Sequence, residues 1–441
     1  MRRLSVHGFR LLLVAFMLVG YAGPYAPKAS AAGESIAAIE SNASYHSRRT
    51  FGIGLYDGVA NKTFIAYSGP EMDVYVKAYN HASQSWEAAV KVYDWNDSSQ
   101  FAYHDYPTMV LLPDGKLGIF ALDHAVSAYL IKAPTAHSLS GTWTRTQIST
   151  DKNTYPMPIV SGQSVYLFYS RNDDLTHPYR TYRYTKSTDN GATWSAPVTA
   201  IDSGKTADKF SEVYAYGVAE KDGKIYVTWS MAGGAGGHNQ ASRHLYLAYL
   251  DTATGQMHNA GGQSMGSVVN EPDLAACLVV SAEPDTASAN YGARHPISNS
   301  APSVTKDGKV VVAYGQQNAD GTSAIRLAAF ASGAWTVRTA DAAAGGFTDV
   351  VKAGAGTNEF EVLYASADGD SLVSKKTTDL GASWTSLYTL AVPFGPGNAD
   401  SIVYANYIEQ RQGIRVVGAT INVAERQTDY TGKWNVFAIK Q

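Results

Sequence analysis

The 441-residue sequence contains a single cysteine, Cys277, which excludes a disulfide within the chain. The apolar run Ala-Ala-Cys-Leu-Val-Val around it predicts a buried, unreactive thiol, because a reactive thiol needs a lowered pKa and a nearby base. The chain also lacks a strong charge bias: its formal net charge of −3 excludes a general electrostatic attraction to nucleic acid or an anionic membrane. Beyond the N-terminus, no stretch approaches the ~20 apolar residues that a transmembrane helix needs.

The N-terminus has the three parts of an export signal. Three arginines within the first ten residues make a basic start, Leu11–Val19 is apolar, and Ala29-Ser30-Ala31 provides a small-residue cleavage site. The apolar part is too short to span a bilayer, so we expect residues 1–31 to be a cleaved signal peptide. The mature protein is then secreted, and residues 32–441 are expected to form one domain.

Six tryptophans follow polar turns that contain Gly or Ser, and most of them recur about every fifty residues. They are Trp86, Trp143, Trp194, Trp335, Trp384 and Trp434. The wide gap between Trp194 and Trp335 accommodates one further unit with a long insertion, which gives seven units. Each unit contains four short strands, and no segment shows a sustained helical period. The pattern predicts an all-β fold, a seven-bladed β-propeller with four-stranded antiparallel blades.

The strand limits are clearest in the second and third units, where Gly-containing turns separate short apolar runs. The second unit is expected to have strands at Pro107–Leu112, Lys116–His124, Ala128–Ala133 and Thr142–Ile148. The third is expected to have them at Met157–Val160, Ser164–Arg171, Thr181–Ser187 and Thr193–Ala200.

Two segments, Ser187–Trp194 and Thr377–Trp384, match the Asp box of sialidase-like propellers. The motif is structural: its Asp and Gly shape the turn between strands three and four, and its Trp packs between blades. We expect a strand within Ser35–Ser47 to close the last blade, because closure leaves no free sheet edge. Residues 258–300, rich in Gly, Ser, Ala and Asn, are expected to form the longest excursion and to wall the cleft.

Antiparallel topology brings the end of strand two and the starts of strands one and three of each blade to one rim. His104 precedes strand one of the second blade and His124 ends its strand two, so we expect the two imidazoles to lie side by side. The next two blades bring tyrosines, arginines and a further histidine to this rim. These are Tyr169, Arg171, Arg180, Arg183, Tyr214, Tyr216, Arg243 and His244.

Carboxylates are scarce among these residues, and the pair Asp173-Asp174 is expected in a loop. Most glycosidases need two carboxylates, whereas His, Tyr and Arg together suit β-elimination on a uronate. An arginine, helped by a histidine, neutralises the substrate carboxylate so that an enediolate can form. A neutral histidine or a tyrosine removes the C5 proton, and a tyrosine or histidine protonates the departing O4.

Three stretches resemble propeller polysaccharide lyases with BNR repeats, a family that includes ulvan lyases and rhamnose–glucuronate lyases. They are Tyr103–Pro107, Leu112–Leu117 with the later His124, and Tyr155-Pro156 with Val165–Tyr169. The resemblance runs from about residue 50 to the end of the chain and is sharpest in residues 100–255.

This resemblance implies an active site made of two histidines on one blade and a tyrosine and an arginine on the next. The histidines match His104 and His124, and the tyrosine matches Tyr169. The arginine is Arg180 or Arg183, between which the sequence does not choose. The remaining arginines at the rim, Arg171 and Arg243, would then contact substrate carboxylate or sulfate groups.

We therefore expect a secreted polysaccharide lyase that cleaves a rhamnose–glucuronate polysaccharide, of the ulvan or arabinogalactan/gum type, by β-elimination. Tyr214, Tyr216 and His244 are expected to bind the substrate as well. The expected partner is an anionic polysaccharide or oligosaccharide, with no nucleic acid or membrane, and the enzyme is expected to be a monomer. The chemistry requires no cofactor and no metal ligands are assigned, while a calcium ion held by loop oxygens would be structural.

Two other functions stay open. A sialidase-like glycoside hydrolase would share the Asp boxes, but Arg48-Arg49-Thr50 lacks the Ile-Pro continuation of the early sialidase motif. A non-catalytic carbohydrate-binding propeller would account for the 29 tyrosines, since their rings stack on sugars. A binding protein does not need the pair of His104 and His124.

Overall fold

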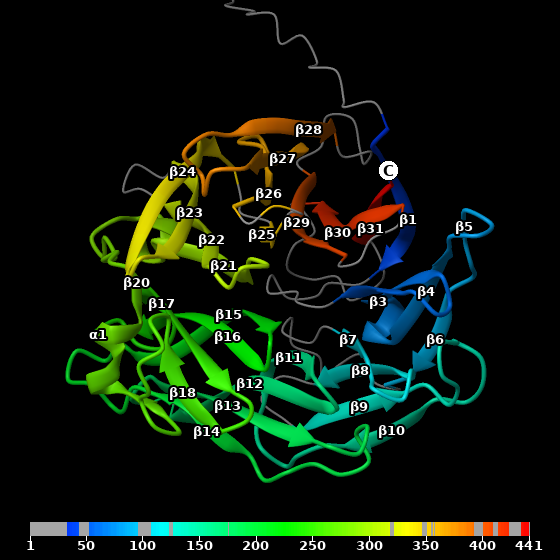
Figure 1. Cartoon of the computed structure of the whole chain (residues 1–441), viewed down its shortest axis with the longest axis horizontal. Coiled ribbons are helices and arrows are strands. Elements are labelled where there is room, and N and C mark those ends of the chain that lie inside the picture. Colours follow the sequence, from blue (N-terminus) through cyan, green and yellow to red (C-terminus); the bar gives the residue numbers. More distant parts are fainter. Residues whose placement is uncertain are drawn as a thin grey trace, which may run out of the picture.

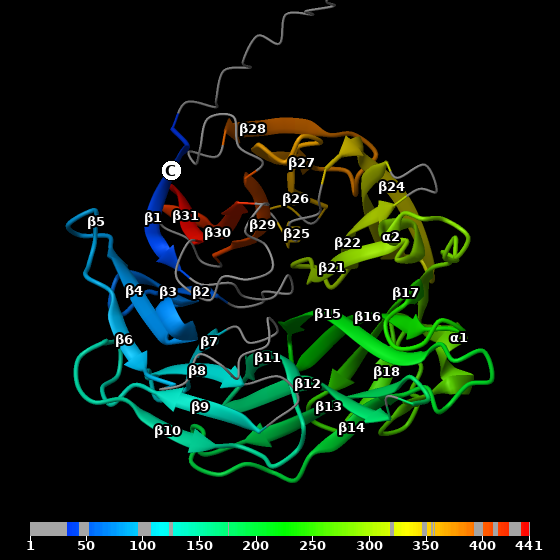
Figure 2. The ribbon, with the colours of Figure 1, turned by 180° about the vertical axis from the view of Figure 1, so that it is seen from behind.

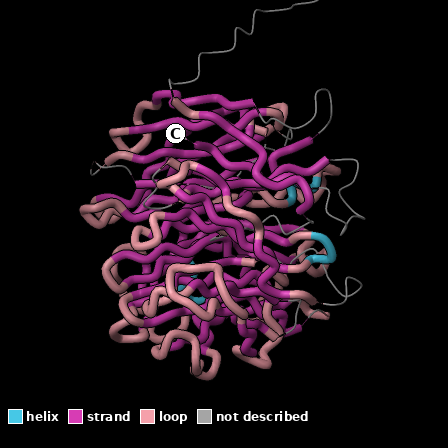
Figure 3. Tube along the Cα trace, turned by 90° about the vertical axis from the view of Figure 1, so that its right-hand side faces the viewer, coloured by secondary structure: helices cyan, strands magenta, loops and turns pink. Residues whose placement is uncertain are grey.

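The computed structural model consists mainly of strands, and its helical segments are few and short (Figure 3). The residues that the structure describes are 33–43, 53–95, 107–122, 127–174, 176–317, 322–345, 351–353, 356, 358–391, 400–408, 413–422 and 434–440. The predicted signal peptide, His104 and His124 lie outside these residues, so the expectations about them stay predictions. Within the described residues, no helix is long and apolar enough to cross a membrane.

The sheets stand side by side in a ring around a central axis, which confirms an all-β propeller (Figure 1). The first sheet contains β2 (Gly54–Asp57), β3 (Lys62–Ser68), β4 (Val74–Asn80), β5 (Ser85–Trp86) and β6 (Val90–Tyr93), with a short 3-10 helix η1 (Pro70–Met72). The second contains β7 (Thr108–Leu111), β8 (Leu117–Leu122), β9 (Ala128–Lys132) and β10 (Thr144–Gln147).

The next two units share one sheet. The first has β11 (Thr154–Ser161), β12 (Ser164–Asp174), β13 (Tyr179–Ser187) and β14 (Val198–Asp202), and the second has β15 (Ser211–Lys221), β16 (Lys224–Gly233), β17 (Ala241–Asp251) and β18 (Gln256–Asn259). They are joined because β13 and β15 pair in parallel at their first residues, with Tyr179 opposite Ser211 and Arg180 opposite Glu212.

Three further sheets complete the ring. They are β21 (Ile297–Val304), β22 (Val310–Gln317), β23 (Ser323–Ala331) and β24 (Ala334–Ala344); β25 (Val351–Ala353), β26 (Phe360–Ala365), β27 (Ser371–Thr377) and β28 (Thr385–Ala391); and β29 (Asp400–Tyr407), β30 (Ile414–Asn422) and β31 (Trp434–Lys440) with β1 (Ser35–Ala43). The N-terminal β1 pairs with the C-terminal β31, Ser35 opposite Lys440, so the predicted closure is confirmed (Figure 2).

The core lies between neighbouring units of the ring. Phe64 of β3 packs in one cluster with Ile119 of β8, and Phe120 of β8 packs with Leu167 of β12 in the next. The last sheet packs against the first in the same way, because Ile65 of β3 shares a cluster with Val436 of β31. Each interface therefore removes apolar surface of two units from water, which is the main driving force for assembling the ring.

The strands of the second unit lie within a few residues of their predicted limits. In the third unit the first three strands are longer than predicted, and the fourth, β14, is shorter. β12 continues to Asp174, and that residue pairs with Tyr179 of β13. The expectation that Asp173 and Asp174 lie in a loop is therefore wrong. They belong to the strand pair that carries the candidate arginines.

The two segments Ser187–Trp194 and Thr377–Trp384 make the same hydrogen bonds in their turns. In the first, the Ser187 hydroxyl accepts from the Gly191 backbone N–H at 2.8 Å, and Asp189 accepts from the Thr193 N–H at 2.8 Å. Hydrogen bonds from the hydroxyl and N–H of Thr193 lower the pKa of Asp189 to about 2. Trp194 packs edge-on against Phe120 of the preceding unit, which fits the structural role expected for this segment.

The stretch between β18 and β21 departs from the four-strand pattern, as the composition of residues 258–300 predicts. It contains β19 (Val269–Asn270), η3 (Glu271–Asp273), α1 (Leu274–Cys277), β20 (Leu278–Val280) and α2 (Tyr291–Arg294). Cys277 at the end of α1 is a free cysteine and only 2% exposed, and burial raises the pKa of its thiol to about 12. The predicted burial of the thiol is confirmed, and the raised pKa is consistent with the predicted low reactivity.

Candidate functional site

Alternation along β12 and β13 distributes the candidate residues over two faces of one unit. Residues paired across antiparallel strands share a face, and Tyr169 pairs with Arg183 while Arg171 pairs with Thr181. We call this side the network face. The intervening residues point the other way: Asn172 pairs with Arg180, and Ser170 pairs both with Tyr182 and with Thr154 of β11. We call this side the Arg180 face.

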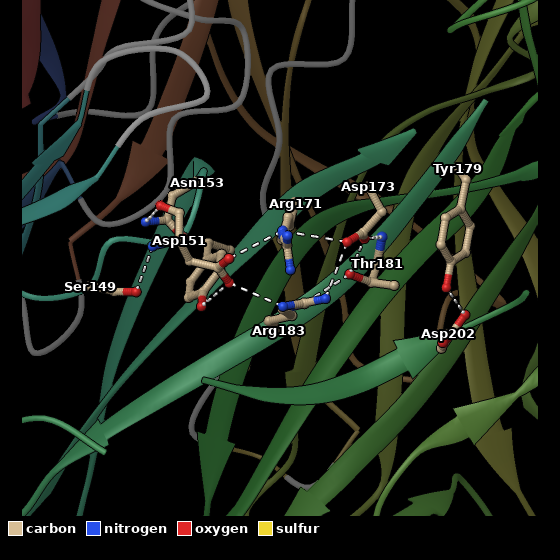
Figure 4. Close-up of polar contacts among 10 residues, drawn as sticks. Ser149, Asp151, Asn153, Arg171, Asp173, Tyr179, Thr181, Arg183 and Asp202 are labelled. Atoms are coloured by element: carbon tan, nitrogen blue, oxygen red, sulfur yellow. Dashed lines mark hydrogen bonds and ion pairs between the residues drawn. The ribbon is translucent and has the colours of Figure 1, made fainter. Parts of the chain in front are cut away.

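Two aspartates and two arginines form the centre of the network face (Figure 4). Asp151, just before β11, has its Oδ2 3.3 Å from Arg183 Nη1 and its Oδ1 3.1 Å from Arg171 Nε. Asp173, near the end of β12, has its Oδ1 3.2 Å from Arg183 Nη2 and 3.4 Å from Arg171 Nε. Each arginine therefore lies between two carboxylates, and each carboxylate lies between two guanidinium groups.

Neighbouring hydrogen bonds hold these side chains in place (Figure 4). The Thr181 hydroxyl donates to Asp173 Oδ2 at 2.6 Å and accepts from Arg183 Nε at 3.0 Å. The backbone around Asp151 is fixed by its own N–H, which donates to the Ser149 hydroxyl, and by Asn153 Nδ2, which donates to the Asp151 carbonyl. The charged groups are thus positioned before any ligand arrives.

Tyr169 contributes its hydroxyl to this network but buries its ring. The hydroxyl donates to Asp151 Oδ2 at 3.0 Å, while the whole residue is 0% exposed and its ring lies in the cluster between β8, β9 and β12. Burial and the negative charge of Asp151 raise the pKa of Tyr169, although Arg183 and Arg171 act in the opposite direction. The expectation that Tyr169 faces an open cleft is wrong, because the alternation of β12 directs its side chain inward together with Val165 and Leu167.

On the Arg180 face, the described residues surround the arginine with aromatic rings rather than carboxylates. Arg180 is 1% exposed, and its guanidinium carbon lies 4.3 Å from the centroid of the Tyr214 ring and 5.6 Å from that of Tyr155. Among the residues that the structure describes, no acidic side chain forms an ion pair with Arg180, whereas Arg183 has two. The two arginines between which the sequence does not choose are therefore distinct: one is neutralised by carboxylates, and the other lies between aromatic rings.

Two further candidates, Tyr216 and Arg243, have contacts of their own. The Tyr216 hydroxyl donates to the Ile297 carbonyl at 3.5 Å, and the ring is buried between β15–β18 and β21–β24, away from Arg180. Arg243 pairs with Asp208 at 2.7 Å and lies over the ring of Phe210. The structure does not gather these residues into one group with Tyr169, contrary to the expectation.

His244, the neighbour of Arg243, links β17 to the insertion. Its Nε2 lies 3.2 Å from Glu283, and its Nδ1 accepts from the backbone N–H of Ala282. Burial lowers the pKa of His244 despite the opposing charge of Glu283. These contacts favour a structural role at the base of the insertion.

Sequence reasoning missed the partners that define both faces. Asp151 lies close to Arg171 because β11 pairs with β12, and Asp173 lies close to Arg183 because β12 pairs with β13. Tyr155 reaches Arg180 through an irregularity in β11. A signal was present: an acidic residue at a strand end beside a strand that carries arginines suggests an ion pair. Within the described ranges, no three His, Cys, Asp or Glu side chains come together in a way that could hold a metal ion.

Comparison with known proteins adds independent findings. The model of a BNR repeat-containing family matches residues 62–343. An ulvan lyase of Alteromonas sp. (strain LOR) is 26% identical over 241 residues, which cover 47% of this chain and 48% of that protein. An ulvan lyase of Pseudoalteromonas sp. (strain PLSV) is 26% identical over 235 residues, or 46% of this chain and 47% of that protein. The chain thus spans about half the length of the curated relatives that it matches.

Solved structures agree on the fold. A PL25 ulvan lyase bound to -[GlcA(1-4)Rha3S]- superimposes with a TM-score of 0.73 at 15% identity, covering 91% of this chain and 95% of that one. The polysaccharide lyase Uly1 gives a TM-score of 0.59 at 12% identity, over 92% of this chain and 99% of that one. At these identities the likeness supports the propeller architecture alone.

Proposed function

Because the chain belongs to the BNR repeat-containing family, we propose that it is a polysaccharide lyase that cleaves a rhamnose–glucuronate polysaccharide by β-elimination. Two ulvan lyases match about half of the chain, which supports the reaction class. The oligosaccharide in the similar PL25 structure contains GlcA and Rha3S, which supports the substrate class. The basic and apolar N-terminus supports secretion.

The observation that carries this proposal is the position of the Tyr169 hydroxyl beside Arg171 and Arg183. β-Elimination needs fixed positive charge at the uronate carboxylate and a proton donor near the leaving oxygen. Both kinds of group meet at the network face. The carboxylates there, Asp151 and Asp173, are already partners of the two arginines, so they do not offer the independent acid and base of a glycosidase.

Arg171 and Arg183 can bind a substrate carboxylate while they keep their ion pairs with the two aspartates. A guanidinium carries five N–H donors, and the contacts of Arg183 with Asp151, Asp173 and Thr181 use one donor on each nitrogen. Donors that remain on Arg183 and Arg171 would stabilise the negative charge of the enediolate. The aspartates then orient the guanidinium groups and hold them rigidly.

The raised pKa of Tyr169 indicates how the two proton transfers are divided. A phenol that keeps its proton is suited to act as the general acid. Because Tyr169 is 0% exposed, the substrate would have to open the network at Asp151 before rotation of the O–H bond could redirect the proton to the departing O4. A neutral histidine would then serve as the base at C5. His104 and His124 are the candidates, and both assignments are predictions.

We also propose that the propeller has seven blades and that Ser187–Trp194 and Thr377–Trp384 are Asp boxes. The described strands form six sheets, and the ten-stranded one contains two successive four-stranded units, which supports that count. The matching hydrogen bonds of the Ser187 and Thr377 turns support the motif. A single domain over residues 32–441 and a monomeric enzyme remain part of the same prediction.

The test is an assay of the mature chain on a panel of uronate polymers, including sulfated and unsulfated rhamnose–glucuronate chains. Ultraviolet absorbance of the conjugated double bond and the number of new reducing ends are followed together. A lyase raises both in equal amounts. New reducing ends without absorbance would identify a hydrolase of the sialidase-like kind, and binding without either signal would identify a carbohydrate-binding propeller.

A further inference from the structure

The Arg180 face contains a buried positive charge without a negative partner in the part of the chain that the structure describes. Arg180 is 1% exposed, and two of its nitrogens, Nε and Nη1, have no hydrogen-bond acceptor among the described residues. The Tyr155 and Tyr214 rings lie near its guanidinium and attract the cation. Such contacts do not replace the hydrogen bonds that a guanidinium loses on leaving water.

Polar side chains around Arg180 also lack partners. Among the described residues, no hydrogen bond reaches Thr154 Oγ1, Ser170 Oγ or Asn172 Oδ1, all of which are buried atoms. Strand pairing places these three side chains on the face of Arg180. Buried polar groups are normally satisfied, and a local concentration of exceptions indicates a ligand or ordered water.

The backbone at this position is strained. Tyr155 has a φ of 61°, in the left-handed region that a bulky residue rarely adopts. The strand pairing shifts register between Thr154 and Met157, so Tyr155 leaves the regular alternation of β11 and its ring comes to Arg180. Strain of this kind is found most often where a ligand-binding geometry must be held.

We propose that Arg180, between Tyr155 and Tyr214, forms a subsite for an oxyanion carried by the polysaccharide, either a uronate carboxylate or a sulfate ester. The oxyanion would accept from Arg180 Nε and Nη1, and the hydroxyls of Thr154 and Ser170 would donate to it or to neighbouring sugar hydroxyls. The inference rests on the proposed function, since it assigns a second anionic group of the same substrate. Arg180 and Arg183 are three positions apart on β13, about 10 Å along a strand, so a second sugar residue is the natural source.

The experiment compares Arg180→Met with Arg338→Met in the full mature chain. Arg338 is an exposed residue of β24, and it serves as the matched control for the same chemical change. Binding of a rhamnose–glucuronate oligosaccharide is measured by calorimetry in its sulfated, desulfated and carboxyl-reduced forms. Thermal unfolding of each variant is measured in parallel.

We expect Arg180→Met to weaken binding of the sulfated oligosaccharide by about 30-fold or more, the loss typical of removing one partner from a buried charged contact. Arg338→Met should bind like the wild type. If the effect of Arg180→Met disappears with the desulfated form, the oxyanion is a sulfate; if it disappears with the carboxyl-reduced form, it is a carboxylate. The melting temperature of Arg180→Met should stay the same or rise, because the substitution removes a buried charge that has no ion-pair partner among the described residues.

Two results would overturn the subsite. One is that Arg180→Met binds all three oligosaccharides as the wild type does, and the other is that the wild type binds none of them. A lower melting temperature together with the first result would mean that an acidic residue of the chain itself neutralises Arg180. If the wild type binds the oligosaccharide and Arg180→Met does not, but no unsaturated uronate forms, then the subsite stands and the proposed lyase reaction fails.

Discussion

The two faces of β12 and β13 use the same residue type, arginine, in opposite ways. On the network face, the side chains of Arg171 and Arg183 are 34% and 19% exposed, and each is close to two carboxylates. On the other face, Arg180 is 1% exposed and has no acidic partner among the described residues. Burial normally demands more pairing, because removing a charge from water costs free energy. Arg180 reverses this relation between burial and pairing, and the proposed anion subsite would account for it.

This difference separates positioning from binding. The aspartates of the network face fix two guanidinium groups, so that their remaining donors already point in a defined direction. In the proposed reaction such preorganised charge would favour catalysis, because no reorganisation would be needed when an enediolate forms. On the Arg180 face, the described residues provide no carboxylate for the guanidinium, and the proposed subsite would bind an anion there.

The largest expected effect is the loss of turnover when the hydroxyl of Tyr169 is removed from the network face. Tyr169→Phe should lower kcat by ~10²–10⁴, because a general acid typically contributes that factor. The ring and its packing are retained, so the fold should persist with a small loss of stability from the missing hydrogen bond to Asp151. Turnover is measured by the absorbance of the unsaturated uronate.

Tyr226→Phe is the matched control for this change. Tyr226 is a tyrosine buried to a similar degree, on β16, and its replacement also removes one hydroxyl from the interior. Its turnover should match that of the wild type. Full activity of Tyr169→Phe would remove Tyr169 from the mechanism and make Tyr214 the better candidate.

The sequence predicted the architecture well because each unit repeats the same physical pattern. Alternating apolar strands with Asp-Gly and Asn-Gly turns determine local structure, and the closing pair of β1 and β31 follows from the need to leave no free edge. The strand limits of the second unit show this, since β8 and β9 differ from the prediction by two residues or fewer.

The sequence predicted the site less well because pairing depends on neighbours in space. Strand alternation assigns Tyr169 and Arg180 to opposite faces, but whether each face is open depends on the next unit. The β7–β10 sheet covers the Tyr169 ring, while β15 brings Tyr214 to Arg180. The irregularity that turns Tyr155 toward Arg180 has no composition signal of its own.

A smaller effect is expected when one arginine of the network is removed. Arg183→Met leaves Asp151 and Asp173 with one cation fewer, and it should lower turnover by ~10²–10³, as loss of one oxyanion donor does. It should also lower the free energy of unfolding by about 1–3 kcal/mol, because polar groups of limited exposure lose a partner. Chemical denaturation measures this change.

The free energy of unfolding of Arg183→Met should be compared with that of Arg180→Met, because the two substitutions are chemically identical and lie on one strand. Only the arginine that has carboxylate partners should stabilise the fold. Equal destabilisation by both substitutions would contradict the distinction between the two faces.

The smallest expected effect is the dependence of turnover on pH, which tests how the proton transfers are divided. Burial and Asp151 raise the pKa of Tyr169, so its proton stays in place throughout the neutral and mildly alkaline range. A histidine base must be neutral, and its ordinary pKa is ~6.5, so kcat should fall about tenfold per pH unit below that value. Above it kcat should level off and stay level to about pH 9, because the acid remains protonated there. If an ionised Tyr169 were the base instead, kcat would keep rising through pH 9, since each further unit of pH would produce more phenolate. Circular dichroism at each pH separates this titration from unfolding, and a continued rise with an intact fold would transfer the role of base from a histidine to Tyr169.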